Sequence, residues 1–175
     1  MLVSSIDAPA HTGSQEWLGL AFSVAVCFAA AGLGSLFTRP AIPGWYARLA
    51  KPSWTPPAWL FGPVWTLLYL LMAVAAWLVW REHGFAGGAA HALVSFAVQL
   101  CLNVLWSVIF FGWKRKGLAL AEIVLLWLAI LTTTIAFHRL TPAAGWLMSP
   151  YLAWVSFAAL LNFSIWRKNE RAVSD

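Results

Sequence analysis

Residues 91–113 read HALVSFAVQLCLNVLWSVIFFGW, a stretch without Asp, Glu, Lys or Arg. A helix needs about 20 apolar residues to span the hydrocarbon core of a bilayer. The stretch also lacks the alternation of apolar and polar residues that marks a strand of a membrane barrel. Because backbone groups in lipid must be hydrogen-bonded within the chain, we predict a membrane-spanning helix here.

Four more stretches of this kind lie at residues 17–37, 58–80, 117–137 and 145–166. Hydrophobic residues make up 62% of the chain and charged residues only 10%, a composition far from that of soluble globular proteins. The sequence therefore predicts an all-α membrane protein in which residues 1–175 form one bundle of five transmembrane helices. The long connection 38–57, between the first two helices, is expected to cap one end of it.

The positive charges gather at one end of the predicted bundle. Nine Lys and Arg residues flank the spans on the side of the 38–57 connection, whereas only Arg81 and Arg139 lie on the other side. Such a bias over short loops marks the cytoplasmic side. It predicts an outside N-terminus and a cytoplasmic C-terminus. A bacterial inner membrane is favoured, with a bacterial or mitochondrial outer membrane left open. The charge orients the chain in the lipid bilayer, so we expect no nucleic-acid partner.

The connection 38–57 is rich in tryptophan and proline. It contains Trp45 and Trp54 together with the pairs Lys51-Pro52 and Thr55-Pro56. A residue before proline favours an extended backbone, which argues against a continuous helix. Connections of this length in compact domains are usually functional. Because its rings need an apolar surface, we expect the connection to lie as a lid on the end of the bundle.

Several of the 13 tryptophans lie deeper than the interfacial level where this residue usually gathers. At about 1.5 Å per residue, Trp65 lies roughly 11 Å, Trp106 about 10 Å and Trp154 about 18 Å from the span ends on the side of the connection. Asn103 shares a helix face with Trp106 and lies about 15 Å deep. All four groups occupy the same half of the membrane, under the predicted lid.

These deep groups have two interpretations. In the first they fill the core, and Asn103 forms an ordinary interhelical hydrogen bond with Asn162 or Gln99. In the second, large rings facing small residues of the first span, such as Ala30 and Gly34, leave a slot. An apolar slot with a few polar groups is typical of a small-ligand site. The set as a whole favours the second interpretation.

Most residues that carry chemistry are absent from the predicted spans. No lysine lies within a span, and the four histidines lie in tails, turns or span ends. No histidine pair could therefore hold a haem iron from both sides, and we predict no metal site and no tightly bound cofactor. Glu122 is the one carboxylate inside a span. Lying about 7 Å from Gly117, it is expected to reach the interface, with a proton relay as the alternative.

Three segments carry a resemblance. The first runs from Trp45-Tyr46 through KPSWTPP at 51–57 to Trp65 and Tyr69. The second is 103–112, which ends in FFG, and the third is 150–167, which begins PYLAW. Over roughly residues 32–169 the chain resembles the TspO/MBR family, in particular its bacterial members. This family comprises the tryptophan-rich sensory proteins and translocator proteins, including the peripheral benzodiazepine receptor.

The resemblance implies a five-helix bundle, often a homodimer, with a ligand cavity closed by the first connection. The implied ligands are porphyrins, such as protoporphyrin IX or haem, sterols, and benzodiazepine-type drugs. Carried over by position, the implied ligand-binding residues are Trp65, Tyr69, Asn103, Trp106, Trp154, Ala158 and Leu161 in the cavity and Trp45 and Trp54 in the lid.

The resemblance also marks a catalytic pair and a sterol motif. Trp65 and Trp154 match residues implicated in light-dependent porphyrin breakdown by bacterial relatives, although no residue here is firmly catalytic. Animal members carry a cholesterol-recognition stretch centred on a tyrosine. The corresponding positions here are Leu161, Phe163 and Arg167, with phenylalanine in place of the tyrosine, which argues against sterol specificity.

Three functions follow from this reading. The preferred one is a binding and sensory membrane protein for tetrapyrroles, with the indole rings stacking on the macrocycle. The second is an enzyme that degrades bound porphyrin in light at the same site. The third is a transporter of porphyrin or sterol, which the sequence itself supports least.

Overall fold

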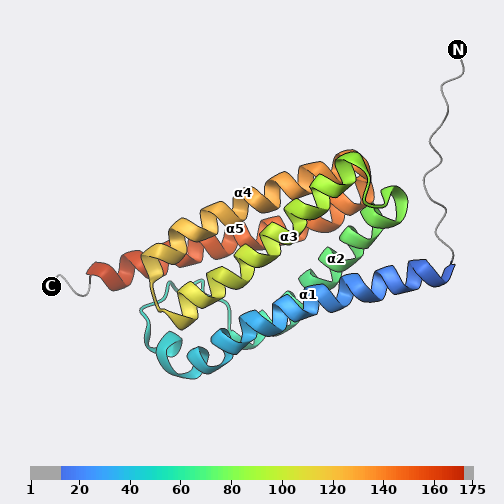
Figure 1. Cartoon of the computed structure of the whole chain (residues 1–175). Helices are drawn as coiled ribbons and strands as arrows, with labels where there is room; N and C mark the ends of the chain where they lie inside the picture. The colour runs from blue at the N-terminus through green and yellow to red at the C-terminus, as the bar shows by residue number, and fades with distance from the viewer. Residues whose placement is uncertain (1–12, 172–175) are drawn as a thin grey trace, which may run out of the picture.

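The structure is a computed structural model that describes residues 13–171, and the predicted outside N-terminal tail up to residue 12 lies beyond them. Five long helices form an antiparallel bundle (Figure 1). They are α1 (Gly13–Ala41), α2 (Ala58–His83), α3 (Gly87–Ser107), α4 (Lys116–Leu140) and α5 (Pro142–Arg171). Short π-helical segments, η1 (Ile42–Tyr46) and η2 (Val108–Gly112), extend α1 and α3. All five helices are long and apolar enough to cross a membrane, which confirms the predicted all-α fold.

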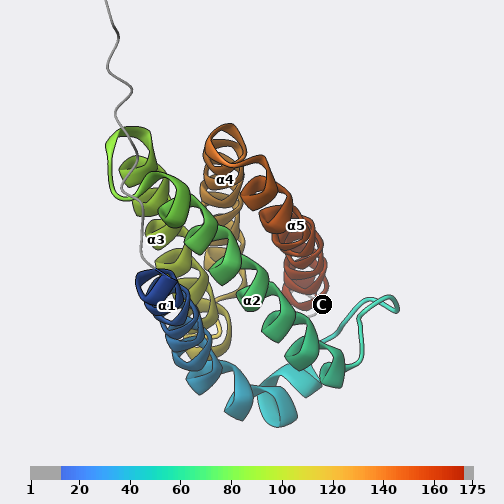
Figure 2. The same cartoon turned by 90° about the vertical axis from the view of Figure 1, so that its right-hand side faces the viewer.

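Neighbouring helices contact one another in the cyclic order α1, α2, α5, α4, α3 (Figure 2). The loop 49–57, the turn 113–115 and the C-terminal end of α5 all lie at one end, which we call the loop end (Figure 1). Each predicted span corresponds to one helix, and the helices run a few residues further at most of their ends. The short turns make consecutive helices antiparallel. However, α2 and α3, although joined by the turn 84–86, are not adjacent in this order and contact each other only weakly.

The first half of the predicted 38–57 connection is helical, so that part of the prediction is wrong. The chain stays helical through Pro40 and η1, and only residues 49–57 are irregular. The π-helical segment η1 accommodates Pro40 and Pro43, two residues that have no backbone N–H to donate. The ammonium group of Lys51 then donates to the carbonyls of Tyr46, Ala47 and Leu49 at 2.8, 2.9 and 3.1 Å. These bonds satisfy carbonyls that the end of a helix leaves unpaired.

The remaining loop is fastened to the end of α5. The side-chain oxygen of Asn169 accepts a hydrogen bond from the Ala50 amide at 3.1 Å, and its nitrogen donates to the Ala50 carbonyl at 2.9 Å. In the same loop, Thr55 donates to the Pro52 carbonyl at 2.7 Å. The loop is therefore bonded to α5 near its start and stabilised by a turn of its own, in addition to the packing of its rings.

Glu122 is buried, contrary to the expectation that it reaches the interface. Its residue is only 5% exposed, and neither carboxylate oxygen has a hydrogen-bond partner among the described residues. The reason is rotational position, because Glu122 lies on the same face of α4 as the buried Ala119, Ile123 and Leu126. That face packs into the bundle, so a long side chain there cannot bend outward to water.

Helices α4 and α5 pack closely along their length. Trp127 Nε1 donates to Ser156 Oγ at 2.8 Å, and Gly117 lies against the Trp166 indole. At the other end, a Cβ added to Gly145 would lie 2.7 Å from His138 Cα, a backbone atom that cannot move aside. The absence of a side chain at position 145 therefore permits this close approach.

We expect Gly145→Ala to destabilise the bundle by roughly 1–3 kcal/mol, the usual penalty for overpacking. The measurement is thermal unfolding of the detergent-purified protein. Gly88→Ala is the matched control, since its added methyl group would meet only Leu140 Cδ2 at an ordinary 3.9 Å. Equal melting temperatures for the two variants would contradict the close packing of α4 on α5.

Candidate functional site

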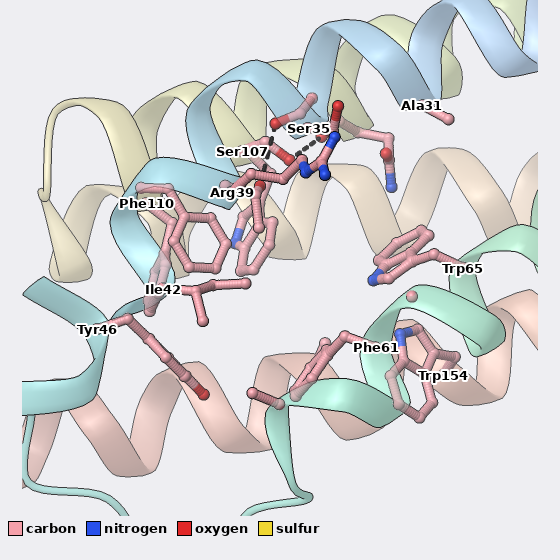
Figure 3. A pocket seen from close by; sticks show the side chains of 18 of the residues that line it. Ala31, Ser35, Arg39, Ile42, Tyr46, Phe61, Trp65, Ser107, Phe110 and Trp154 are labelled. Atoms are coloured by element: carbon pink, nitrogen blue, oxygen red, sulfur yellow. Dashed lines mark hydrogen bonds between the residues drawn. The ribbon is translucent and has the colours of Figure 1, made fainter. Parts of the chain in front are cut away.

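A cavity of about 600 Å³ lies in the loop-end half of the bundle, between α1, α2, α3 and α5. A volume of this size is typical of sites for small organic ligands. Seven of the nine predicted ligand-binding residues line it: Trp65, Tyr69, Asn103, Trp106, Trp154, Ala158 and Leu161. Figure 3 shows the labelled lining residues around the cavity, with Trp65 and Trp154 at one end and Tyr46, Ile42 and Phe110 at the other.

Aromatic rings form most of the walls. Trp106 stacks on Phe110 with ring centroids 5.1 Å apart and planes inclined by 16°. Trp65 packs against Tyr69 at 5.7 Å on its own helix. Trp154 contacts Phe61 edge-on at 5.8 Å. Because each ring is held by a neighbouring ring, the flat faces are fixed in place before any ligand arrives.

Asn103 lies at the centre of a buried hydrogen-bond network. Its side-chain oxygen accepts a bond from the Tyr69 hydroxyl at 2.6 Å, and its nitrogen donates to the Tyr151 hydroxyl at 3.0 Å. The predicted pairing with Asn162 or Gln99 is therefore wrong. The reason is reach, because two tyrosines on α2 and α5 extend to Asn103 across the bundle, whereas the Gln99 amide nitrogen faces Met72 Sδ at 4.0 Å.

Small residues supply the space between the rings. Gly34 on α1 lies close to α3, where an added Cβ would be 3.2 Å from Ser107 Oγ. Ala158 lies one helical turn after Trp154 on α5 and lines the same cavity. Ala30 and Gly34 are both buried within the bundle, which favours the packing and pocket-wall interpretations of the small-residue half of α1.

Trp45 and Trp54, the two predicted lid residues, do not line the cavity. Trp45 packs edge-on against Phe110 at 5.6 Å, and Trp54 packs against Phe157 at 5.6 Å. Because the first helix continues to residue 48, it carries Trp45 behind the Phe110 wall rather than over the opening. Trp45 therefore supports a wall residue from outside, whereas the partner of Trp54, Phe157, does not line the cavity.

The residues of the sterol-like motif are divided between two places. Leu161 is buried and lines the cavity, whereas Phe163 and Arg167 line a smaller pocket of about 300 Å³ with Pro52 and Trp54. Residues two apart on a helix point to nearly opposite sides, which explains the division. The three residues therefore do not form one site.

The cavity-lining residues that were not foreseen as site residues include Arg39, Tyr46, Phe61 and Asn162. Arg39 was read only as an orienting charge. Tyr46 lines the cavity because η1 continues the first helix. The sequence did not predict this continuation. Phe61 lies one turn before Trp65 and Asn162 one turn after Ala158, so helical spacing from the predicted residues could have found both. Tyr151, the third member of the Asn103 network, lies in the PYLAW segment but was not predicted as a site residue.

Comparison with known proteins agrees with this architecture. Residues 23–167 match the TspO/MBR family. The chain is 42% identical to the tryptophan-rich protein TspO of Chlorobaculum tepidum over 160 residues, which cover 89% of this chain and 99% of that protein. It is 44% identical to the human translocator protein over 138 residues, covering 78% and 82% of the two chains.

A third relative is the tryptophan-rich sensory protein of Cereibacter sphaeroides, 40% identical over 156 residues, which cover 89% of this chain and 94% of the relative. The matched region contains all five helices except the first turns of α1 and the end of α5. Five apolar helices and these relatives together identify an integral, multi-pass membrane protein. The chain belongs to the TspO/MBR family.

Proposed function

We propose that this protein binds porphyrins and related flat, hydrophobic molecules in its ring-walled cavity as a sensory or translocator protein. The observation that carries the proposal is the cavity of about 600 Å³ whose walls include Trp65, Trp106 and Trp154. Indole faces stack well on extended aromatic systems, and each such contact contributes about 0.5–1.5 kcal/mol beyond the burial of area. Sterols and benzodiazepine-type drugs are further candidates, because an apolar cavity discriminates weakly among apolar shapes.

The proposal also covers the orientation of the protein in the membrane, the type of membrane and the oligomeric state. We infer a cytoplasmic loop end, since the basic residues gather there and positive charge marks the cytoplasmic side. A bacterial inner membrane fits this bias, and a homodimer fits the family resemblance. The porphyrin is a ligand that comes and goes rather than a resident cofactor, so the cavity must be able to release it.

Light-dependent breakdown of the bound porphyrin is the second candidate. It is favoured by Trp65 and Trp154, which both line the cavity and can exchange electrons with an excited macrocycle as redox-active indoles. Neither indole nitrogen has a hydrogen-bond partner among the described residues. Both rings are therefore available to a ligand, whether it is only bound or also degraded.

The test is a titration of protoporphyrin IX into detergent-purified protein in the dark, followed by tryptophan fluorescence. We expect saturable quenching at one site per chain, weakened about tenfold in Trp65→Phe and Trp154→Phe through the loss of indole contacts. Trp146→Phe is the control, because Trp146 is 70% exposed and lies outside the cavity. Unsaturable quenching, or equal affinity in all four proteins, would refute the proposed site.

Two extensions separate the alternatives. Illumination of the bound complex tests breakdown, and a porphyrin spectrum unchanged by light would exclude the enzymatic candidate. Flux of a labelled porphyrin into proteoliposomes tests transport. Flux no faster than into empty vesicles would exclude that function.

A further inference from the structure

The cavity contains more hydrogen-bond donors than its own residues can use. The Trp106 ring nitrogen is buried without a partner, and the side-chain nitrogen and oxygen of Asn162 are both unpartnered although this residue is only 1% exposed. The ring nitrogens of the half-buried Trp65 and Trp154 also have no partner among the described residues, although they do not belong to the buried set. Buried polar atoms are nearly always hydrogen-bonded in folded proteins, so an orphaned set that lines a cavity points to bonds made with a ligand.

The other polar groups do not remove this imbalance. The hydroxyls of Ser35, Thr38 and Thr66 donate to backbone carbonyls of their own helices at 2.7, 3.0 and 2.9 Å. The Asn103 oxygen already accepts from Tyr69. No Asp or Glu lines the cavity. A ligand that accepts hydrogen bonds therefore suits this cavity better than one that donates them.

Arg39 adds a positive charge to the donors. It lies two residues before the end of α1 and lines the cavity. In Figure 3 its side chain lies beside Ser35 and Ser107, across the cavity from Phe61 and Trp154. Ser35 is one helical turn deeper than Arg39, so the side chain of Arg39 runs along α1 at the rim of the cavity while the residue remains exposed.

Within residues 13–171, no ion pair or hydrogen bond holds Arg39 in that position. The ion pair found among residues 13–171 joins Arg81 and Glu82, near the opposite end of the bundle. Most charges of the same loop end are also positive, namely Arg48, Lys51 and the basic turn 114–116, and Glu170 near the end of α5 is the acidic residue there among the described ones. A guanidinium in this surrounding is a strong site for an anion, above all for a carboxylate, which it binds through two parallel bonds.

We propose that Arg39 binds a carboxylate on the edge of the ligand, with Trp106 Nε1 and the Asn162 amide as further donors to the same polar edge. The inference rests on the proposed function and specifies it: the ligand is a tetrapyrrole acid whose apolar body lies against Trp65 and Trp154. Trp106 and Asn162 suit this role by position, since Asn162 lies about 12 Å along α5 from Trp154 toward the loop end. The cavity thus selects for a flat molecule with an acidic edge over an equally flat neutral one.

The test compares protoporphyrin IX with its dimethyl ester, which keeps the macrocycle and removes the negative charges. Fluorescence titrations in the dark give the affinity of each compound for the unaltered protein, Arg39→Gln, Arg39→Lys and Arg48→Gln. Arg48 is the matched control because it is exposed at the same end and does not line the cavity. The melting temperature of each variant shows that the bundle remains folded.

We expect the unaltered protein and Arg48→Gln to bind the acid at least about tenfold more tightly than the ester, as a charged hydrogen bond provides. In Arg39→Gln this preference should fall to near one through weaker binding of the acid alone, and Arg39→Lys should restore part of it. Equal affinity for acid and ester, or an unchanged preference in Arg39→Gln, would overturn the role of Arg39 while leaving porphyrin binding intact. Binding of neither compound to the unaltered protein would refute the proposed function itself.

Discussion

Ala158→Phe is expected to abolish porphyrin binding, lowering affinity by at least about a hundredfold, while the bundle stays folded. Ala158 lines the cavity on the same stripe of α5 as Trp154 and Leu161, so a benzyl group at this position would occupy the space of the macrocycle. Filling an existing void adds contacts that the empty cavity lacks, so the melting temperature should be unchanged or higher. The measurement is the fluorescence titration together with a thermal unfolding curve.

Ala153→Phe makes the same chemical change on the same helix. Ala153 is exposed on the outer face of α5 and does not line the cavity, so its added ring would lie in lipid. We expect this variant to bind porphyrin like the unaltered protein. If both variants bind normally, or if both lose binding equally, the ligand does not occupy the cavity.

Asn103→Leu is expected to destabilise the bundle more than any other change to its polar groups. It would leave the hydroxyls of Tyr69 and Tyr151 without their partner, and these residues are only 4% and 0% exposed. Hydrogen bonds between membrane helices contribute about 0.6 kcal/mol on average. Two buried hydroxyls without partners should cost more, about 1–3 kcal/mol in total, because the penalty is their desolvation. Denaturant or thermal unfolding in detergent measures the difference.

The triple variant Asn103→Leu, Tyr69→Phe and Tyr151→Phe separates this network from simple loss of packing. It removes every member of the network and leaves no orphaned hydroxyl, so it should be more stable than Asn103→Leu alone. If the triple variant were less stable than the single one by the sum of the separate losses, the three side chains would not act as a unit.

The helices could be predicted from the sequence because apolar length alone determines a membrane span. Residues 91–113 contain no Asp, Glu, Lys or Arg, and lipid allows such a stretch few conformations other than a helix. The depth of each group from its span end then placed Trp65, Trp106 and Trp154 in one half of the membrane, and all three line the cavity. These residues required only periodicity and direction, both of which are properties of the local sequence.

Of the parts that were missed, one depends on a local cap and the others on contacts between distant segments. Proline usually ends a helix, but Lys51 caps the chain after Pro40 and Pro43, so the first helix extends to residue 48. Glu122 is buried because of the rotation of α4, which neighbouring helices determine. The partners of Asn103 could not be chosen from sequence because several hydroxyls and amides lie at similar depths.

Arg39 shows a different limit of prediction from sequence. Its charge fits the bias that orients the protein, and that explanation accounts for the residue fully at the level of sequence. Only the structure shows that it also lines the cavity, where the described residues offer it no carboxylate. One residue can therefore serve both membrane orientation and ligand recognition, and its second role is visible only in three dimensions.

Photo-crosslinking of a diazirine-bearing protoporphyrin, with the labelled peptides mapped by mass spectrometry, tests the central claim most directly. The account predicts that labels fall on cavity-lining segments, chiefly 58–69 of α2 and 154–162 of α5, and that excess unlabelled protoporphyrin IX prevents them. Ala158→Phe should lose these labels. Labels that gather instead on lipid-facing positions such as Trp17 and Trp146, which are 73% and 70% exposed, would contradict a binding site inside the bundle.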